Sequence, residues 1–205
     1  MKKLLLILLC LNFSFVIAQN TTPVTKFTIE RCGTEAITQQ REINYPQYKI
    51  ARDKVNLQTK NWIKKNTNHN LKTVITIPVV VHVVWNTNTE NISDAQILSQ
   101  IDVLNEDFRR TNVDAINTPS VWQSIAADSE IEFCLASIDP NGLPTNGIDR
   151  VQTTHGQFGM DSDIHTSAAG GADDWPNDDY LNIWVCDITN TLLGYASPPS
   201  NWIGD

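Results

Sequence analysis

The sequence predicts an α/β fold in which one long helix packs on a twisted, mixed β-sheet. Residues 73–85 form a run rich in β-branched side chains, and residues 97–108 repeat apolar side chains at helical spacing. Two further apolar segments follow at residues 131–138 and 180–188. Strand, helix and strands in this order indicate a layered α/β domain. The composition is that of a globular protein, because 41% of the 205 residues are hydrophobic and only nine each are glycine and proline.

The expected first strand is almost uniformly apolar. Residues 73–85 contain Ile75, Ile77 and six valines. Such a run is typical of a strand that is covered on both faces, whereas a half-exposed strand alternates polar and apolar residues. Pro78 has no N–H group, so it is expected near the start of the strand or at an unpaired position.

The helix that follows has a recognisable start. Ser93 is the expected N-cap, and Gln96 lies three residues later, as in a capping box. One apolar stripe then runs along the helix, made of Ile97, Ile101, Leu104 and Phe108. Beyond the two later strands, residues 192–196 are expected to form a short edge strand that ends at Pro198.

The N-terminus has the features of a secretory signal peptide. Lys2 and Lys3 precede an apolar run over residues 4–17, and Ala18 completes a plausible cleavage site. The run is too short to span a bilayer, which needs about 20 apolar residues. Residues 1–18 are therefore predicted to be a signal peptide, and the mature protein is expected to be secreted without an integral membrane span.

Residues 19–70 are polar and are predicted to be a pro-segment with a linker. Their clearest pattern lies in residues 46–65, where Tyr48, Val55 and Trp62 recur every seven residues. This spacing predicts one amphipathic helix. Residues 71–205 carry the apolar segments and are predicted to form the folded domain.

Charge excludes one class of partner and suggests one metal. The formal net charge of −8 argues against nucleic acid, since phosphate binding needs a basic face. A glycine-rich loop carries several acids, whose oxygens could bind calcium. Their spacing does not match an EF-hand, and a solvated acidic loop is the alternative. These acids are Asp161, Asp163, Asp173, Asp174, Asp178 and Asp179.

Three cysteines remain after removal of the signal peptide. An odd number in an oxidising compartment leaves at least one thiol without a partner in the chain. Cys134 and Cys186 lie in similar apolar segments, so they are disulfide candidates, with two buried thiols as the alternative. Cys32 stands apart in a polar stretch.

The sequence contains no complete catalytic motif. Zinc hydrolases carry two histidines four residues apart with a glutamate between them, and no pair among His69, His82, His155 and His165 has this spacing. His82 lies inside the first strand and is expected to be a core residue. His155 and His165 are expected in solvated loops.

Several segments in register nevertheless resemble one family. They are residues 31–34, 77–84, 92–111, 131–136, 147–150, 170–171, 180–186 and 193–196. In this order they are similar to the pappalysin-type zinc metallopeptidases, a group of metzincins, and within them to the bacterial cytophagalysin branch. The resemblance covers roughly residues 30–199. It implies the upper subdomain of a secreted, zinc-dependent endopeptidase that acts on peptide or protein substrates.

The resemblance also implies roles for two segments. Family members bind zinc through a later helix with a histidine-glutamate motif, which is absent up to residue 205, so the chain is predicted to be truncated before this helix and inactive by itself. Cys32 matches the pro-segment cysteine that resembles a cysteine switch, a ligand of zinc in the latent state. Residues Leu193, Gly194, Tyr195 and Ala196 match the edge strand that pairs with substrate backbone.

Three functional interpretations stay open on these grounds. The first is the N-terminal part of a secreted zinc endopeptidase. The second is a non-catalytic, secreted module that binds peptides along its exposed edge strand. The third is a degraded gene product without a stable fold, which would expose a large apolar patch.

Overall fold

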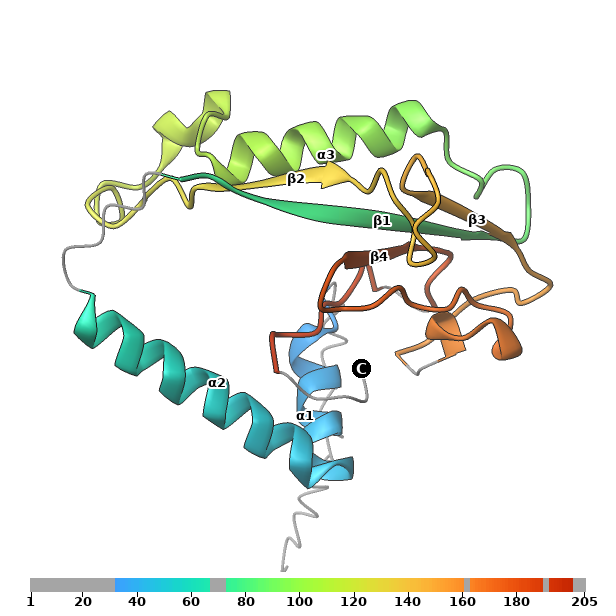
Figure 1. The fold of residues 1–205 in the computed structure, drawn as a ribbon, viewed down its shortest axis with the longest axis horizontal. Coiled ribbons are helices and arrows are strands. Elements are labelled where there is room, and N and C mark those ends of the chain that lie inside the picture. The colour runs from blue at the N-terminus through green and yellow to red at the C-terminus, as the bar shows by residue number, and fades with distance from the viewer. Residues whose placement is uncertain (1–31, 67–72, 161–162, 190–191, 201–205) are drawn as a thin grey trace, which may run out of the picture.

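The computed structural model describes residues 32–66, 73–160, 163–189 and 192–200. Its centre is a four-stranded sheet around the long strand β1, Ile75–Trp85 (Figure 1). The other strands are β2 (Ile131–Leu135), β3 (Ile148–Gln152) and β4 (Leu181–Val185). The predicted signal peptide lies outside the described residues.

β1 is the central strand because it has partners along both edges. β2 pairs with its first half and β3 with its second half, so these two strands follow each other along one edge. β4 overlaps both halves of β1 in register and must therefore lie along the opposite edge. The predicted α/β class is confirmed, with one difference. All three pairs between these strands are parallel, so the mixed pairing expected of the sheet is not seen among them.

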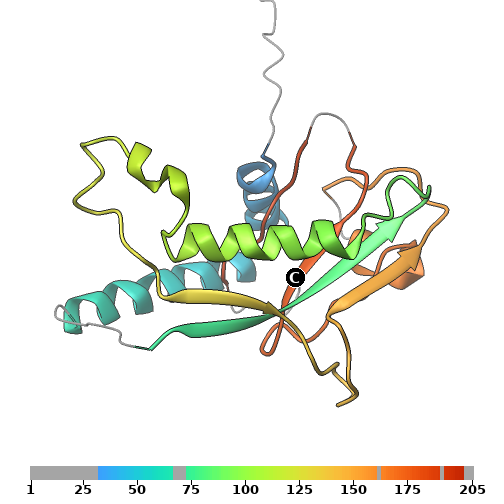
Figure 2. The same ribbon diagram turned by 90° about the horizontal axis from the view of Figure 1, so that it is seen from above.

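Both faces of β1 are covered over residues 79–84, as its uniform apolar sequence predicts, whereas three of its first four residues are exposed. Val79, Val81 and Val83 face helix α3 (Asp94–Phe108) and form one core with Ile97 and other buried residues of that layer. Figure 2 shows α3 lying across this face of the sheet.

On the opposite face, Val84 packs with Phe158, Ile164 and Ala172. These three residues come from the long segment between β3 and β4, which has no helix longer than a single turn in its described part. The segment contains the short 3₁₀ helices η2 (Asp163–His165) and η3 (Ser167–Ala169). Irregular chain therefore covers this face of the sheet, as α3 covers the other face.

Local signals place α3 as expected. The Ser93 hydroxyl accepts a hydrogen bond from the Gln96 N–H, and the Gln96 side chain accepts one from the Ser93 N–H, which completes the predicted capping box. Asn105 of α3 then satisfies the outer edge of β2. Its side chain donates to the Phe133 carbonyl at 3.0 Å and accepts from the Phe133 N–H at 2.7 Å.

Pro78 lies within β1 and pairs in register with Cys134 of β2. The backbone groups of β1 that bond along the β2 and β3 edge belong to odd-numbered residues such as Val79 and Val81. The nitrogen of Pro78 therefore faces the other edge, where the pairing with β4 begins only at Val79. The proline sits at an unpaired position, as predicted.

Two helices precede the sheet. Helix α2 spans Pro46–Lys65, which matches the predicted amphipathic helix. Helix α1, Thr34–Asn44, was not predicted, and neither was β3. The two helices pack at Tyr48, which is fully buried, and an ion pair of 2.5 Å joins Arg52 to Glu42. Apart from this contact α2 is largely exposed, since Trp62 at its far end keeps 49% of its surface accessible.

Within the described residues no helix is both long enough and apolar enough to cross a membrane.

Candidate functional site

The segment that was predicted to bind peptides is in contact with the start of the predicted pro-segment. Cys32 and Gly194 form a parallel β-bridge, and the Gly33 N–H donates to the Gly194 carbonyl at 2.9 Å. The Ala196 N–H donates to the Thr34 hydroxyl at 2.9 Å. Two backbone groups of the edge segment are thus already bonded to residues 33 and 34.

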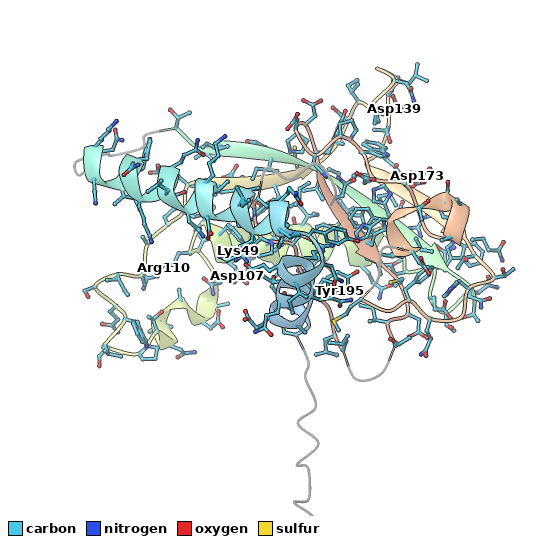
Figure 3. The ribbon with its side chains drawn as sticks, turned by 90° about the horizontal axis from the view of Figure 1, so that it is seen from below. Lys49, Asp107, Arg110, Asp139, Asp173 and Tyr195 are labelled. Carbon is cyan, nitrogen blue, oxygen red and sulfur yellow. The ribbon has the colours of Figure 1, made fainter. Side chains whose placement is uncertain are left out.

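Helix α1 adds a contact beyond these bonds. The Arg41 guanidinium donates to the Ser197 hydroxyl at 2.6 Å, so the contact continues for two turns into the helix. In Figure 3, Tyr195 lies next to α1. Leu193 points away, with 75% of its surface exposed. The edge segment is therefore covered by chain at Gly194 and Ala196 and open at Leu193.

The Cβ position of Gly33 is crowded by side chains. A Cβ atom there would lie 2.7 Å from the Met160 sulfur, 3.2 Å from Leu192 Cδ2 and 3.4 Å from Tyr195 Cβ. The first of these distances is shorter than real Cβ contacts. A larger residue at position 33 would therefore require the flexible Met160 side chain to move.

Residues 193–196 do not form a named strand and do not pair with β4 among the described residues. The edge strand expected at 192–196 is therefore reduced to the single bridge from Gly194 to Cys32. The physical reason is that its backbone groups bond to residues 33 and 34.

The Cys32 thiol is exposed and donates to the Thr34 hydroxyl at 3.4 Å. It is one suitable zinc ligand, since thiolates bind zinc well. In the described part of the chain, however, no group of three or more His, Cys, Asp or Glu side chains is placed to hold a metal ion. These residues by themselves do not fit a complete zinc site.

The same holds for calcium. Asp173 accepts hydrogen bonds from the Ser167 N–H at 2.7 Å and from the Ser167 hydroxyl at 2.8 Å. These bonds hold the pKa of Asp173 below its usual value. Asp173 thus caps the turn at η3, while Asp161 lies outside the described residues.

The suggested disulfide between Cys134 and Cys186 is not formed. Both thiols are free. Cys134 lies on β2, and Cys186 directly follows β4, so the two cysteines lie on opposite sides of β1. Sequence could not exclude the pair, because similar apolar segments can lie on the same or on opposite edges of a sheet.

Cys186 is expected to be the slowest of these thiols to react. Burial raises its pKa to about 11, and the negative charge of Asp187 adds to the shift. At pH 8 its thiolate fraction is therefore about a hundredfold smaller than that of an ordinary thiol. Iodoacetamide labelling of the mature protein, followed by mass spectrometry, should modify the exposed Cys32 and Cys134 first. Unfolding in urea should remove the difference, and equal rates for all three cysteines in the native protein would contradict it.

Two of the three described histidines lie where they were expected, and the third does not. His82 is fully buried, as predicted, and His155 is exposed. His165 was expected in solvent, but both its ring nitrogens are buried and its ring packs edge-on against Trp184 at 4.2 Å. That prediction was wrong, because the 163–173 segment folds back under the sheet.

The structure thus brings Cys32 together with Gly194 and Ala196 through Thr34, a member of the segment 31–34, and it adds two residues that the sequence did not indicate. These are Arg41 and Ser197, and the contacts of Thr34 and Arg41 join positions more than 150 residues apart. Serine and arginine are common surface residues, so no local pattern marks them.

The fold matches part of a metallopeptidase. Three similar solved structures are of mirolysin, a metallopeptidase. A Tannerella forsythia promirolysin mutant is 47% identical, with a TM-score of 0.67 over 81% of this chain and 53% of that one. Mature T. forsythia mirolysin in complex with a cleaved peptide is 54% identical, with a TM-score of 0.60 over 62% of this chain and 47% of that one.

A third structure, mirolysin in complex with compound 9, is 54% identical and covers 57% of this chain and 44% of that one, with a TM-score of 0.55. The present chain thus spans about half the length of the mirolysin chains that it matches. Comparisons with protein-family models and with curated proteins gave no match.

Proposed function

We propose that this chain is the N-terminal part of a secreted, zinc-dependent endopeptidase in its latent form. The observation that carries the proposal is the bonding of residues 33 and 34 to Gly194 and Ala196. An exposed strand edge binds extended peptides through its backbone groups. A pro-segment that uses these groups first would keep substrate away until it is removed.

The comparisons support this division of the chain. Promirolysin matches 81% of this chain, whereas the two mature mirolysin structures match 57% and 62%. This difference is expected if α1 and α2 correspond to a pro-segment that the mature protein has lost. We therefore assign residues 19–70 to a pro-segment and linker, and residues 71–205 to the catalytic domain. Residues 1–18 remain the proposed signal peptide for secretion.

A mature mirolysin structure contains a cleaved peptide. For this chain we propose peptide or protein substrates, bound along Leu193, Gly194, Tyr195 and Ala196. From the sequence resemblance we further propose that the chain belongs to the cytophagalysin branch of the pappalysins, within the metzincins. Zinc would be bound by residues outside those described here, and Cys32 is the ligand that this chain would add in the latent state. Attachment to the same chain would give this thiol an effective concentration in the millimolar range.

Peptide binding tests the proposal. The probe is a fluorescent peptide that covers residues 30–41, measured by anisotropy against two proteins, residues 19–205 and residues 72–205. We expect binding only to the shorter protein, because its edge segment has lost the internal partner. Ala196→Pro in the shorter protein is the matched control, since it removes the N–H group that bonds to Thr34. Equal binding to both proteins, or no binding to the shorter one, would contradict the proposal.

The non-catalytic peptide-binding module is the second candidate, and the exposed side chain of Leu193 beside the edge favours it. Both candidates predict that the edge binds peptide. They differ in catalysis, so casein hydrolysis by a longer protein that extends beyond residue 205, abolished by a chelator, would decide for the endopeptidase.

A further inference from the structure

His82 joins three strands at the centre of the sheet. Its side chain is completely buried in β1. Nδ1 lies 3.0 Å from a carboxylate oxygen of Asp149 on β3, and Nε2 lies 3.0 Å from the side-chain oxygen of Asn182 on β4. The ring also stacks on Trp184, with 5.0 Å between ring centroids and 20° between planes.

The orientation of the Asn182 amide is fixed by backbone groups. Its oxygen accepts from the Trp175 N–H at 2.8 Å, and its nitrogen donates to the Trp175 carbonyl at 2.8 Å. A reversed amide would place its NH₂ group against the Trp175 N–H and its oxygen against the Trp175 carbonyl. Both contacts would be unfavourable, because one joins two donors and the other joins two acceptors. The atom that faces Nε2 of His82 is therefore an acceptor, and Nε2 must carry a proton.

The other ring nitrogen also faces an acceptor. The Asp149 side chain is 38% exposed, so its carboxylate is in contact with water, and a carboxylate offers acceptor atoms only. A hydrogen bond from the ring to this carboxylate needs a second proton, on Nδ1. The ring is then a cation, which its stacking on Trp184 also favours.

We propose that His82 is held as a doubly protonated imidazolium, and that this proton fastens β1, β3, β4 and the Trp175 segment together. The inference goes beyond the proposed function and does not depend on it. A neutral ring has one N–H group only. Loss of the proton would leave a ring lone pair against an oxygen atom at 3.0 Å inside the protein, on the side of either Asp149 or Asn182.

The charged surroundings of His82 are consistent with a cation. β3 contributes Asp149, and the segment before β4 contributes Asp173. The pKa of Asp173 is lowered mainly by its hydrogen bonds from Ser167, and a positive charge on His82 would add a smaller effect. β4 contributes the uncharged Asn182 and Trp184.

Two further titratable side chains lie behind the tryptophans that contact the ring. His165 packs on Trp184, and Tyr180 packs on Trp175.

The proton makes stability depend on pH in a defined direction. An unfolded histidine has a pKa of about 6.5. A proton that the folded protein holds and the unfolded chain releases contributes less to stability as the pH rises. For one proton the unfolding equilibrium constant rises by at most about tenfold per pH unit.

The first test is direct. In the mature protein with ¹⁵N-labelled histidine, side-chain NMR at pH 7.5 should show both nitrogens of His82 protonated. His155, which is exposed, is the internal reference for a histidine in contact with water. One unprotonated nitrogen on His82 would overturn the proposal.

The second test uses Asp149→Asn. The new amide can donate to Nδ1 of a neutral ring, so the variant can keep both hydrogen bonds without the extra proton. Urea unfolding at several values between pH 6 and pH 9 should show a smaller loss of stability with rising pH than in the wild type. Asp53→Asn, which removes a carboxylate of α2 that pairs with Lys49, is the control and should keep the wild-type slope. The same slope in Asp149→Asn as in the wild type would also overturn the proposal, and the NMR measurement decides if this variant does not fold.

Discussion

Phe133→Ala is expected to lower the free energy of unfolding by about 3–5 kcal/mol, the usual range for removing a buried aromatic side chain. Phe133 is only 7% exposed and belongs to the core between β1 and α3. Its ring packs edge-on against Phe108 at 4.8 Å. Removing it would leave a cavity under α3 that neighbouring rigid elements cannot fill. Urea unfolding monitored by circular dichroism measures the loss.

Phe108→Ala is the matched control for this prediction. Phe108 is the other half of the ring pair but keeps 40% of its surface exposed. Its replacement by alanine would leave a space that is open to solvent and not a closed cavity. The loss in the free energy of unfolding should therefore be less than half as large. Equal losses for the two variants would show that the core does not lie where the structure has it.

Gly171→Ala is expected to cost about 3 kcal/mol or more, at or above the upper end of the usual cost of overpacking. A Cβ atom at this position would lie 2.2 Å from the Ile164 carbonyl oxygen and 2.4 Å from that of Asp163. Both are backbone atoms, which cannot turn aside as a side chain can. The segment would have to separate, and Ile164 and Ala172 would leave the core on that face of the sheet.

Gly156→Ala is the control for this second prediction, because nothing lies within 4 Å of its Cβ position. Its effect should stay within about 0.5 kcal/mol. Thermal unfolding and the near-ultraviolet signal of the tryptophans should separate the two variants. Similar melting temperatures for both would mean that the segment between β3 and β4 is not packed as described.

These two predictions concern the two layers that cover β1. The sequence indicated the layer formed by α3 but not the opposite layer. The strand β1 and helix α3 were predicted because their signals are local. A run of β-branched residues favours extended chain, and a capping box followed by one apolar stripe favours a helix. The opposite layer has no such pattern, since the described part of residues 156–175 is irregular apart from two short 3₁₀ helices, and only its buried contacts make it part of the core.

Helix α1 and strand β3 were not predicted, for related reasons. The sequence of α1 is largely polar, and only Ile37 and Thr38 are buried in it. The five residues of β3 include Asp149 and Arg150, which are uncommon in a sheet interior. Both are used there, since Asp149 bonds to His82 and the Arg150 guanidinium donates to the Ile92 carbonyl next to α3 at 2.8 Å.

For the candidate site, the sequence indicated the participants but not their arrangement. Cys32 and residues 193–196 were singled out separately, through the family resemblance. The contact between them depends on the course of the chain after β4. The same is true of the hydrogen bonds that Thr34 and Arg41 make to the edge segment. The suggested pairing of Cys134 with Cys186 was wrong for the same reason, because the sequence of neither segment indicates which edge of β1 it joins.

By itself the sequence determined which segments become helix or strand wherever hydrogen bonds and apolar spacing act between near neighbours. Only the tertiary structure decided which backbone groups at Gly194 and Ala196 are already bonded, which thiols stay apart, and which atoms face the ring of His82. The physical reason is distance along the chain. These contacts join positions from about 70 to more than 150 residues apart, and their geometry is set by the order and direction of the strands between them.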